Sequence, residues 1–309
     1  MNYLEEFQQI VEAYKEGDEI IQDGSLIING NSVVGKHEVE GLHIETRSTK
    51  EGVEVRVSVD KGVKIEQPIH LCFGMTKDKG RQVINSEFII NDGASAEFLA
   101  HCSFPNAIRI EHIMGSKVEV GKHAKMSYLE EHYHSDDGNT LVQPKLRGII
   151  HEGGQLKEEF KLVKGKVGTL DIDYEIRQLE HSSCELLTKV FGKKKDKIKV
   201  RESISLDGAY ASGVAKSRIV LLDDAKGEVL GEISGNAPYT KGHVDCHEVV
   251  QGENAIAISK PQVMVNNPLA RITHEAALGR INRKELETLM ARGLDEDEAV
   301  EFIVNGMLK

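Results

Sequence analysis

The feature that most restricts the fold is a long succession of short, alternating, strand-like segments. From about residue 27 to about residue 281, apolar and polar residues alternate in one run after another, and no helical pattern interrupts them. Residues 53–59 read VEVRVSV, with four valines on one face and Glu54, Arg56 and Ser58 on the other. Glycine, aspartate, asparagine and lysine separate the runs, as expected of tight turns. Such a chain folds as a sandwich, a barrel, a propeller or a β-helix.

Among these four architectures, the β-helix fits the sequence best. The series of strands is longer than a single sandwich needs. The chain has no tryptophan and only 6 prolines, which disfavours an immunoglobulin-like core and the blade repeats of propellers. Small turn residues recur at short intervals, as stacked coils require, although no strict sequence repeat is present. We therefore predict a mainly β protein with a β-helix core over residues 26–281.

Helical patterns are confined to the two ends of the chain. Residues 1–25 carry apolar residues at helical spacing on one face and predict a helix that caps the core. Residues 282–309 predict two short amphipathic helices. Asn282 is the expected N-cap of the first, with Glu285 as its capping-box partner and Gly293 as its stop, and the second has Asp295 and Glu298 in the same roles.

These two C-terminal helices have apolar faces that allow two interpretations. The faces consist of Leu286, Leu289 and Met290 in the first helix, and of Val300, Ile303, Val304 and Met307 in the second. The helices either cover the open end of the β domain, which the pattern favours, or offer a helical face to another protein.

Charge and cysteine usage exclude several classes of function. The net charge is −11, with 50 acidic against 39 basic residues, so the chain repels nucleic-acid backbones. The one dense basic stretch, residues 192–201, is expected to be a solvated turn. The 4 cysteines are far apart, which indicates a reducing cytoplasm rather than a disulfide framework. We expect no signal peptide and no membrane span. No phosphate-binding loop is present, so any ATP that drives the protein must be hydrolysed by another chain.

The most suggestive reactive residue is Cys246, in the alternating run HVDCHEVV. A lone cysteine in a strand is usually a small buried apolar residue. However, His274 and Glu275 follow 28 and 29 residues later, about the length of one coil of a β-helix, and stacked coils lie about 4.8 Å apart. A thiolate, an imidazole and a carboxylate together suit iron or zinc. A permanent iron–sulfur carrier would need four closely spaced thiolates, so this set suits a protein that gives its cluster away.

A second candidate metal site is the stretch EEHYHSDDG at 130–138. His132 and His134 share one strand face and could chelate a divalent metal. The interpretation we favour is a polar strand end that runs into an acidic turn. Cys72 and Cys102 are expected in core strands, and Cys184 is expected to be structural.

The C-terminal part of the chain resembles the SufB/SufD family, the scaffold proteins of the Suf system of iron–sulfur cluster assembly. The resemblance rests on GHVDC at 242–246, KPQVMVNNPLARITHEAALGRI at 260–281 and LETLMARGLDEDEAVEFIVNGML at 286–308. It extends more weakly upstream through QPIHLCFGM at 67–75 and RIEHIMG at 109–115.

This resemblance implies a right-handed parallel β-helix core flanked by terminal helices, and a non-catalytic scaffold that pairs through the β-helix. It implies that Cys246, Glu275 and His274 hold a transient cluster, expected to be [4Fe–4S]. It also implies that the C-terminal helices bind a SufC-like ABC-type ATPase and that apo iron–sulfur proteins receive the cluster in the cytoplasm. The HEA string is SufB-like. The chain lacks the CxxCxxC segment of many SufB proteins, so it resembles a minimal member that forms a homodimer.

Two alternatives remain at this stage. The chain could be a SufD-like structural subunit that carries no cluster. It could instead be a β-helix enzyme acting on carbohydrates, which its aromatic content of 5% and its lack of tryptophan disfavour.

Overall fold

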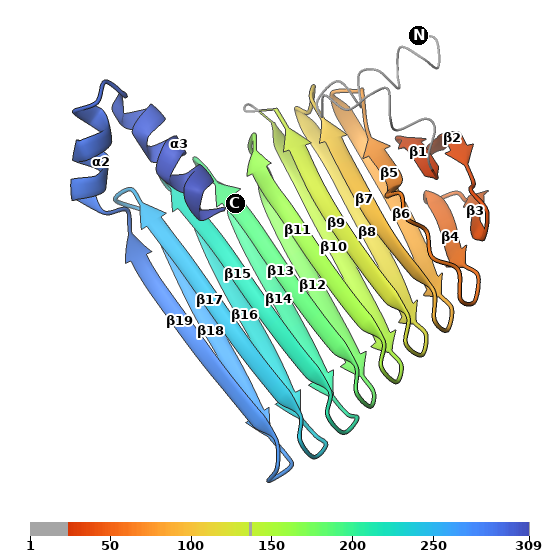
Figure 1. The fold of residues 1–309 in the computed structure, drawn as a ribbon. Helices are drawn as coiled ribbons and strands as arrows, with labels where there is room; N and C mark the ends of the chain where they lie inside the picture. Colours follow the sequence, from red (N-terminus) through yellow and green to blue (C-terminus); the bar gives the residue numbers. More distant parts are fainter. Residues whose placement is uncertain (1–23, 136–137, 309) are drawn as a thin grey trace.

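The computed structural model describes residues 24–135 and 138–308. They form a β-solenoid in which two sheets face each other and successive coils stack along one axis, from β1 at one end to β19 at the other (Figure 1). In the regular part of the solenoid, each coil contributes one strand to each sheet. The prediction of a mainly β protein with a parallel β-helix core is confirmed. The predicted helix over residues 1–25 falls almost entirely outside the described residues.

The first sheet consists of β2 and the odd-numbered strands other than β3, and the second sheet consists of β3 and the even-numbered strands other than β2. The 10-stranded first sheet runs in the spatial order β2 (Ser32–His37), β1 (Ser25–Asn29), β5 (Ile69–Gly74), β7 (Ser95–Phe104), β9 (Lys125–His134), β11 (Gln155–Lys164), β13 (Ser183–Gly192), β15 (Ser212–Leu222), β17 (Lys241–Gln251) and β19 (Arg271–Arg280). The 9-stranded second sheet runs in the order β3 (Leu42–Ser48), β4 (Val53–Val59), β6 (Lys79–Ile90), β8 (Arg109–Val120), β10 (Asn139–Ile150), β12 (Gly168–Gln178), β14 (Lys197–Leu206), β16 (Lys226–Gly235) and β18 (Ile256–Val265).

The register between coils fixes which side chains stack on one another. The first coil is irregular, since β1 pairs with β2 and β3 pairs with β4 in antiparallel hairpins. From β5 and β6 on, the strands pair in parallel with those of the next coil, and the residues in register differ by 28 to 30 positions. Gln155 pairs with Ser183, Ser183 with Ser212, and Lys241 with Arg271. Side chains at equivalent positions therefore form continuous rows along the axis.

Alternation along each strand divides these rows into an interior and an outer surface. All four valines of β4 are buried and the residues between them are more exposed. The interior is filled by aliphatic and aromatic side chains, with Phe88 in edge contact with Phe98 at 5.2 Å and with Tyr128 at 5.5 Å between ring centroids. Burial of a side chain of this size contributes about 1.5–3 kcal/mol. Strands in which apolar and polar residues alternate can therefore build the whole domain, because their apolar side chains fill this interior.

The two C-terminal helices, α2 (Arg283–Met290) and α3 (Glu296–Met307), begin where the sequence predicts. The Asn282 side chain accepts a hydrogen bond from the backbone N–H of Lys284, but Glu285 does not complete the expected capping box. Asp295 and Glu298 form the complete capping box of α3. Gly293, with φ +103°, lies in the turn between the helices.

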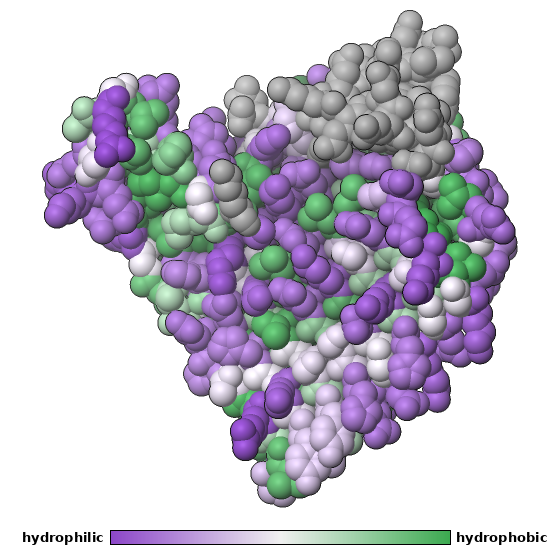
Figure 2. All heavy atoms as spheres, viewed as in Figure 1, coloured by the Kyte–Doolittle hydropathy of each residue, from purple (hydrophilic) through white to green (hydrophobic). Residues whose placement is uncertain are grey.

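The helices do not cover the open end of the solenoid, contrary to the interpretation that the pattern favours. They pack on the outer face of the first sheet, over Phe191 of β13, Val220 of β15 and Val249 of β17. Figure 2 shows the apolar side chains gathered between the two helices and the solenoid. Strands β18 and β19 remain largely exposed in the single chain, as their burial patterns show.

The basic stretch at 192–201 forms the turn between β13 and β14 and the start of β14, so the interpretation as a turn is confirmed. Within the described part of the chain, no helix has the length and apolar character needed to cross a membrane.

Candidate functional site

Cys246 lies on the interior face of β17, one coil from the open end of the solenoid. Its side chain is only 2% exposed. It stacks on Ser217 of β15 on one side and on Ala276 of β19 on the other. Ala276 is small and exposed. Only its methyl group, on the last coil, therefore separates the thiol from the open end.

Polar groups share this part of the interior. Glu248, two residues further along β17, faces the same side as Cys246 and is buried. Its Oε1 accepts a hydrogen bond of 3.0 Å from the Ser217 hydroxyl, whereas its Oε2 has no hydrogen-bond partner among the described residues. Across the interior, a Cβ on Gly231 would lie 2.6 Å from Val244 Cγ1 and 3.6 Å from Cys246 Sγ. The lack of a side chain at residue 231 therefore makes room for Val244, which lies next to the thiol on β17.

The electrostatic environment keeps the Cys246 thiol neutral in the isolated chain. Burial raises the pKa of the Cys246 thiol to about 11, although the nearby hydroxyls of Ser217 and Ser259 act in the opposite direction. Burial also raises the pKa of Glu248. At neutral pH Cys246 is thus a protonated thiol, and iron would have to displace its proton to bind.

His274 and Glu275 lie on the neighbouring strand β19, and both are exposed. His274 is in register with Val244 and therefore projects toward the same interior side as Cys246. Glu275 is in register with Asp245, whose outward carboxylate forms an ion pair with Arg218 at 2.5 Å. Successive side chains in a strand point to opposite faces, so Glu275 lies on the outer face.

Their spacing led us to expect Cys246 and Glu275 on one face, but the single chain places them on opposite faces. The reason is the length of the coil, which is 30 residues at this point because Lys241 pairs with Arg271. A separation of 29 residues reaches the neighbouring coil but falls one residue short of register, and one residue reverses the face. An approach of the two groups across two chains stays a prediction.

Several polar residues of this interior were not included among the predicted site residues. Glu248 follows from alternation alone, since it is two residues after the thiol. Ser217 and Ser259 lie on other strands, and only the register places them beside Cys246. Glu202 of β14 is a further buried carboxyl, and its Oε1 accepts a hydrogen bond of 2.6 Å from the Thr188 hydroxyl.

The preferred interpretation of the stretch around His132 and His134 is right in part. Strand β9 does end at His134, but both histidines are almost fully buried in the solenoid, and so is Glu130. The Nδ1 of His132 lies 3.2 Å from the Nε2 of His134, and the Nε2 of His132 lies 2.7 Å from Glu130 Oε1. Asp136 and Asp137 lie outside the described residues. Cys72, Cys102 and Cys184 are buried, as expected.

The helical residues predicted to bind a partner divide into two groups. Leu286, Val300 and Val304 are buried against the solenoid, so they are not available to a partner in this conformation. Leu289 and Ile303 are partly buried, whereas Met290 and the neighbouring Phe302 are exposed.

The buried Glu202 leads to a prediction about stability and pH. Burial raises its pKa from 4.5 to about 7, so the folded state keeps a proton that the unfolded chain loses between these pH values. Stability is therefore lost as the pH rises through this window. We expect the stability of Glu202→Gln relative to the wild type to increase by about 2–3 kcal/mol between pH 5 and pH 8. Urea unfolding at both pH values measures it, and a difference that does not change with pH would contradict the burial effect.

Comparison with known proteins identifies the family. Residues 73–307 match the family model described as SUF system FeS cluster assembly, SufBD core domain. The chain is 42% identical over 314 residues to an iron–sulfur cluster assembly SufBD family protein of Methanocaldococcus jannaschii, covering 100% of this chain and 99% of that protein. It is 34% identical over 313 residues to a SufBD family protein of Pyrococcus horikoshii, covering 100% and 95% respectively. The chain therefore belongs to the SufBD family of iron–sulfur cluster assembly proteins.

Proposed function

We propose that this chain is a non-catalytic scaffold on which an iron–sulfur cluster is assembled and from which it is transferred to apo acceptor proteins. The observation that carries the proposal is the position of Cys246, inside the solenoid but one thin coil from its open end. A thiol in that position is shielded from solvent and still within reach of a cluster that enters through the end. Only one thiolate per chain is available there, which suits release better than permanent storage.

The proposed ligands are Cys246, His274 and Glu275. His274 shares the interior side of the solenoid with Cys246 and is open to solvent at the end. Glu275, on the outer face of β19, would reach a cluster only from a second chain or after a shift of β19. Glu248 lies on the same face as Cys246 and adds a carboxylate oxygen, Oε2, which has no hydrogen-bond partner among the described residues. We expect the cluster to be [4Fe–4S] and to be bound transiently.

A second copy of the chain is the proposed cover of the open end. Strand β19 is the last strand of its sheet and has one edge that no strand of the described residues pairs with, and an uncovered edge favours association. Apolar side chains are exposed on the last coil and its turns. They are Ile256, Ile258, Met264, Val265, Leu269 and Leu278. A homodimer that joins two open ends would place two Cys246 thiols near one junction.

A SufC-like ABC-type ATPase is the proposed partner at α2 and α3. Strand β19 ends at Arg280, and α2 begins three residues later at Arg283. Because β19 is the last strand of its sheet and is joined directly to α2, displacement of α2 would pull on the coil that covers Cys246. ATP binding by the partner would thus shift the scaffold between closed and open states.

The exposed Phe302 provides a test of the ATPase contact. Its side chain is 63% exposed on α3, and aromatic residues at the centre of an interface often contribute more than 2 kcal/mol. We expect Phe302→Glu to weaken binding of the ATPase by at least about 30-fold, as measured by isothermal titration calorimetry. Ile108→Glu, on the loop before β8, is the matched control and should bind normally. Equal affinity of the Phe302 variant and the wild type would place the contact elsewhere.

The proposed scaffold role is tested by anaerobic purification of the chain together with its ATPase, followed by counts of iron, sulfide and subunits. The proposal predicts iron and sulfide in the complex and two copies of each protein. Lack of iron under conditions that load other cluster proteins would favour the second candidate, a SufD-like structural subunit.

A further inference from the structure

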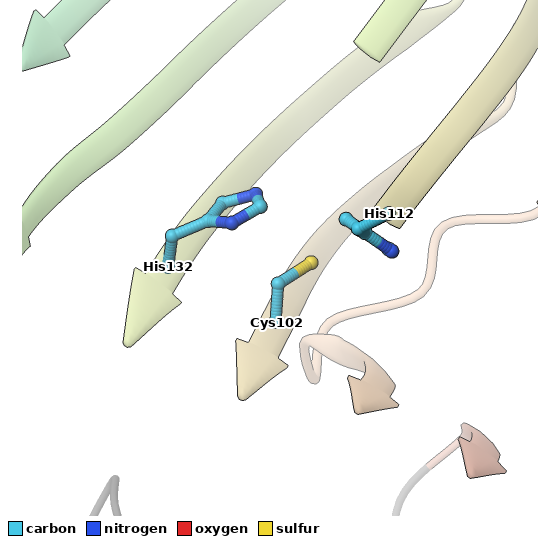
Figure 3. A group of neighbouring side chains, drawn as sticks. All are labelled: Cys102, His112 and His132. Atoms are coloured by element: carbon cyan, nitrogen blue, oxygen red, sulfur yellow. The ribbon is translucent and has the colours of Figure 1, made fainter. Parts of the chain in front are cut away.

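A second group of metal-binding side chains lies deep in the solenoid, far from the open end. It consists of Cys102 on β7, His132 on β9 and His112 on β8 (Figure 3). One donor atom from each, the Cys102 sulfur and one ring nitrogen of each histidine, all lie within 4.8 Å of one another. Strand β7 is five strands from β17 in the sheet order, so the group lies about 24 Å from Cys246.

The fold builds this group through exact register. Cys102 and His132 are in register on neighbouring strands of the first sheet, so both project into the interior at the same level. His112 enters from the second sheet on the opposite side. The separation of 30 residues between Cys102 and His132 equals a full coil here, unlike the separation of Cys246 and Glu275.

His112 is the residue that most requires an explanation. It is 0% exposed, and neither ring nitrogen has a hydrogen-bond partner among the described residues. Its ring packs against Phe104 at 4.9 Å and His132 at 5.7 Å between centroids. Leaving a buried polar group unpaired is unfavourable, and such a group in a native structure points to an absent water or ion.

We propose that Cys102, His112 and His132 bind one divalent transition-metal ion with the preferences of Zn²⁺, at a site separate from the cluster scaffold around Cys246. Thiolate and imidazole are ligands that zinc prefers. Two donors on one tetrahedral zinc lie about 3.5 Å apart, so the donors need to move together by about 1 Å. Rotation of the imidazole rings and of the Cys102 side chain supplies such a movement.

The surroundings of the group supply the support that a buried metal needs. Glu130 lies 2.7 Å from Nε2 of His132, and a carboxylate on one ring nitrogen orients a histidine that binds metal through the other. That other nitrogen, Nδ1, now lies 3.2 Å from Nε2 of His134, so the ion would replace this contact. An imidazole binds metal in its neutral form. On binding, the Cys102 thiol gives its proton to solvent. The Glu130 carboxyl gives its proton to solvent as well, so the thiolate and the carboxylate together balance the charge of a divalent ion, as a buried site requires.

The test uses the full-length chain carrying Cys246→Ala, in which the proposed cluster ligand is absent. The chain is produced with Zn²⁺ or Co²⁺ in the medium and purified anaerobically, and metal is counted by mass spectrometry. Co²⁺ also serves as a spectroscopic probe, because a thiolate ligand gives a sulfur-to-cobalt charge-transfer band. We expect about one ion per chain, with that band present.

Variants in the same background then assign the ligands. Cys102→Ser should remove the charge-transfer band and most of the metal, and His112→Phe should remove the metal. Cys184→Ser, which changes another buried interior thiol, should retain both. A folded Cys246→Ala chain without metal, or a charge-transfer band that persists in Cys102→Ser, would overturn the proposal. If His112→Phe does not fold, the decision rests on the metal content and the charge-transfer band of Cys102→Ser, each compared with the Cys246→Ala parent. None of these results depends on cluster assembly at Cys246.

Discussion

Replacing Cys246 with alanine should remove the cluster from the scaffold while leaving the solenoid folded. Cys246 provides the one thiolate at the open end of the interior, and loss of a supporting group around a metal already costs about 10–100-fold in affinity. We therefore expect bound iron and sulfide to fall by at least about tenfold after anaerobic reconstitution. Loss of a small buried side chain costs the fold only about 1 kcal/mol, so the circular dichroism spectrum should not change.

The matched control for this experiment is Cys184→Ala, since Cys184 is likewise an interior thiol of the first sheet and is also buried. It should retain the full cluster absorbance. A folded Cys246→Ala protein with wild-type iron, sulfide and absorbance would exclude Cys246 as a necessary ligand.

The second large effect is expected from Leu278→Glu, at the uncovered end of the solenoid. Leu278 is in register with Glu248 and projects from the interior side of β19, yet 57% of its side chain is exposed because no coil follows. In the proposed homodimer this side chain is buried. A carboxylate there would remain unpaired in an apolar contact, so we expect the dissociation constant of the dimer to rise by at least about 100-fold.

Analytical ultracentrifugation over a range of concentrations measures this effect. Ile108→Glu is the control, because Ile108 is 58% exposed but lies on the turn between β7 and β8, away from the open end. If the Leu278 variant and the wild type dimerise equally well, the two chains meet through another surface.

The sequence was sufficient to predict the solenoid, because the fold is built from local alternation. The valines of residues 53–59 are buried as a set, and the runs after them became strands of the two sheets. The caps at Asn282 and Asp295 also followed from local chemistry. The sequence analysis did not identify the repeat of the turns, in which His181, Tyr210 and Tyr239 all adopt positive φ. Only the structure shows that these turns stack, with ring centroids 4.9 Å apart.

What the sequence could not supply was the exact register. Coils vary between 28 and 30 residues, and an error of one residue moves a side chain to the other face. That variation separates Glu275 from Cys246 within one chain, and it places His132 directly beside Cys102. The burial of Leu286, Val300 and Val304 was equally out of reach, because an amphipathic helix shows an apolar face without showing which surface it contacts.

The most direct test of the scaffold is to locate iron in the complex of this chain with its ATPase, by anomalous diffraction from crystals grown anaerobically after loading with iron and sulfide. We predict an anomalous iron signal within bonding distance of the Cys246 sulfur, with His274 beside it, where the open ends of two solenoids meet. Iron found only away from Cys246, with that thiol still sealed beneath Ala276, would contradict the assembly of a cluster at this end of the solenoid.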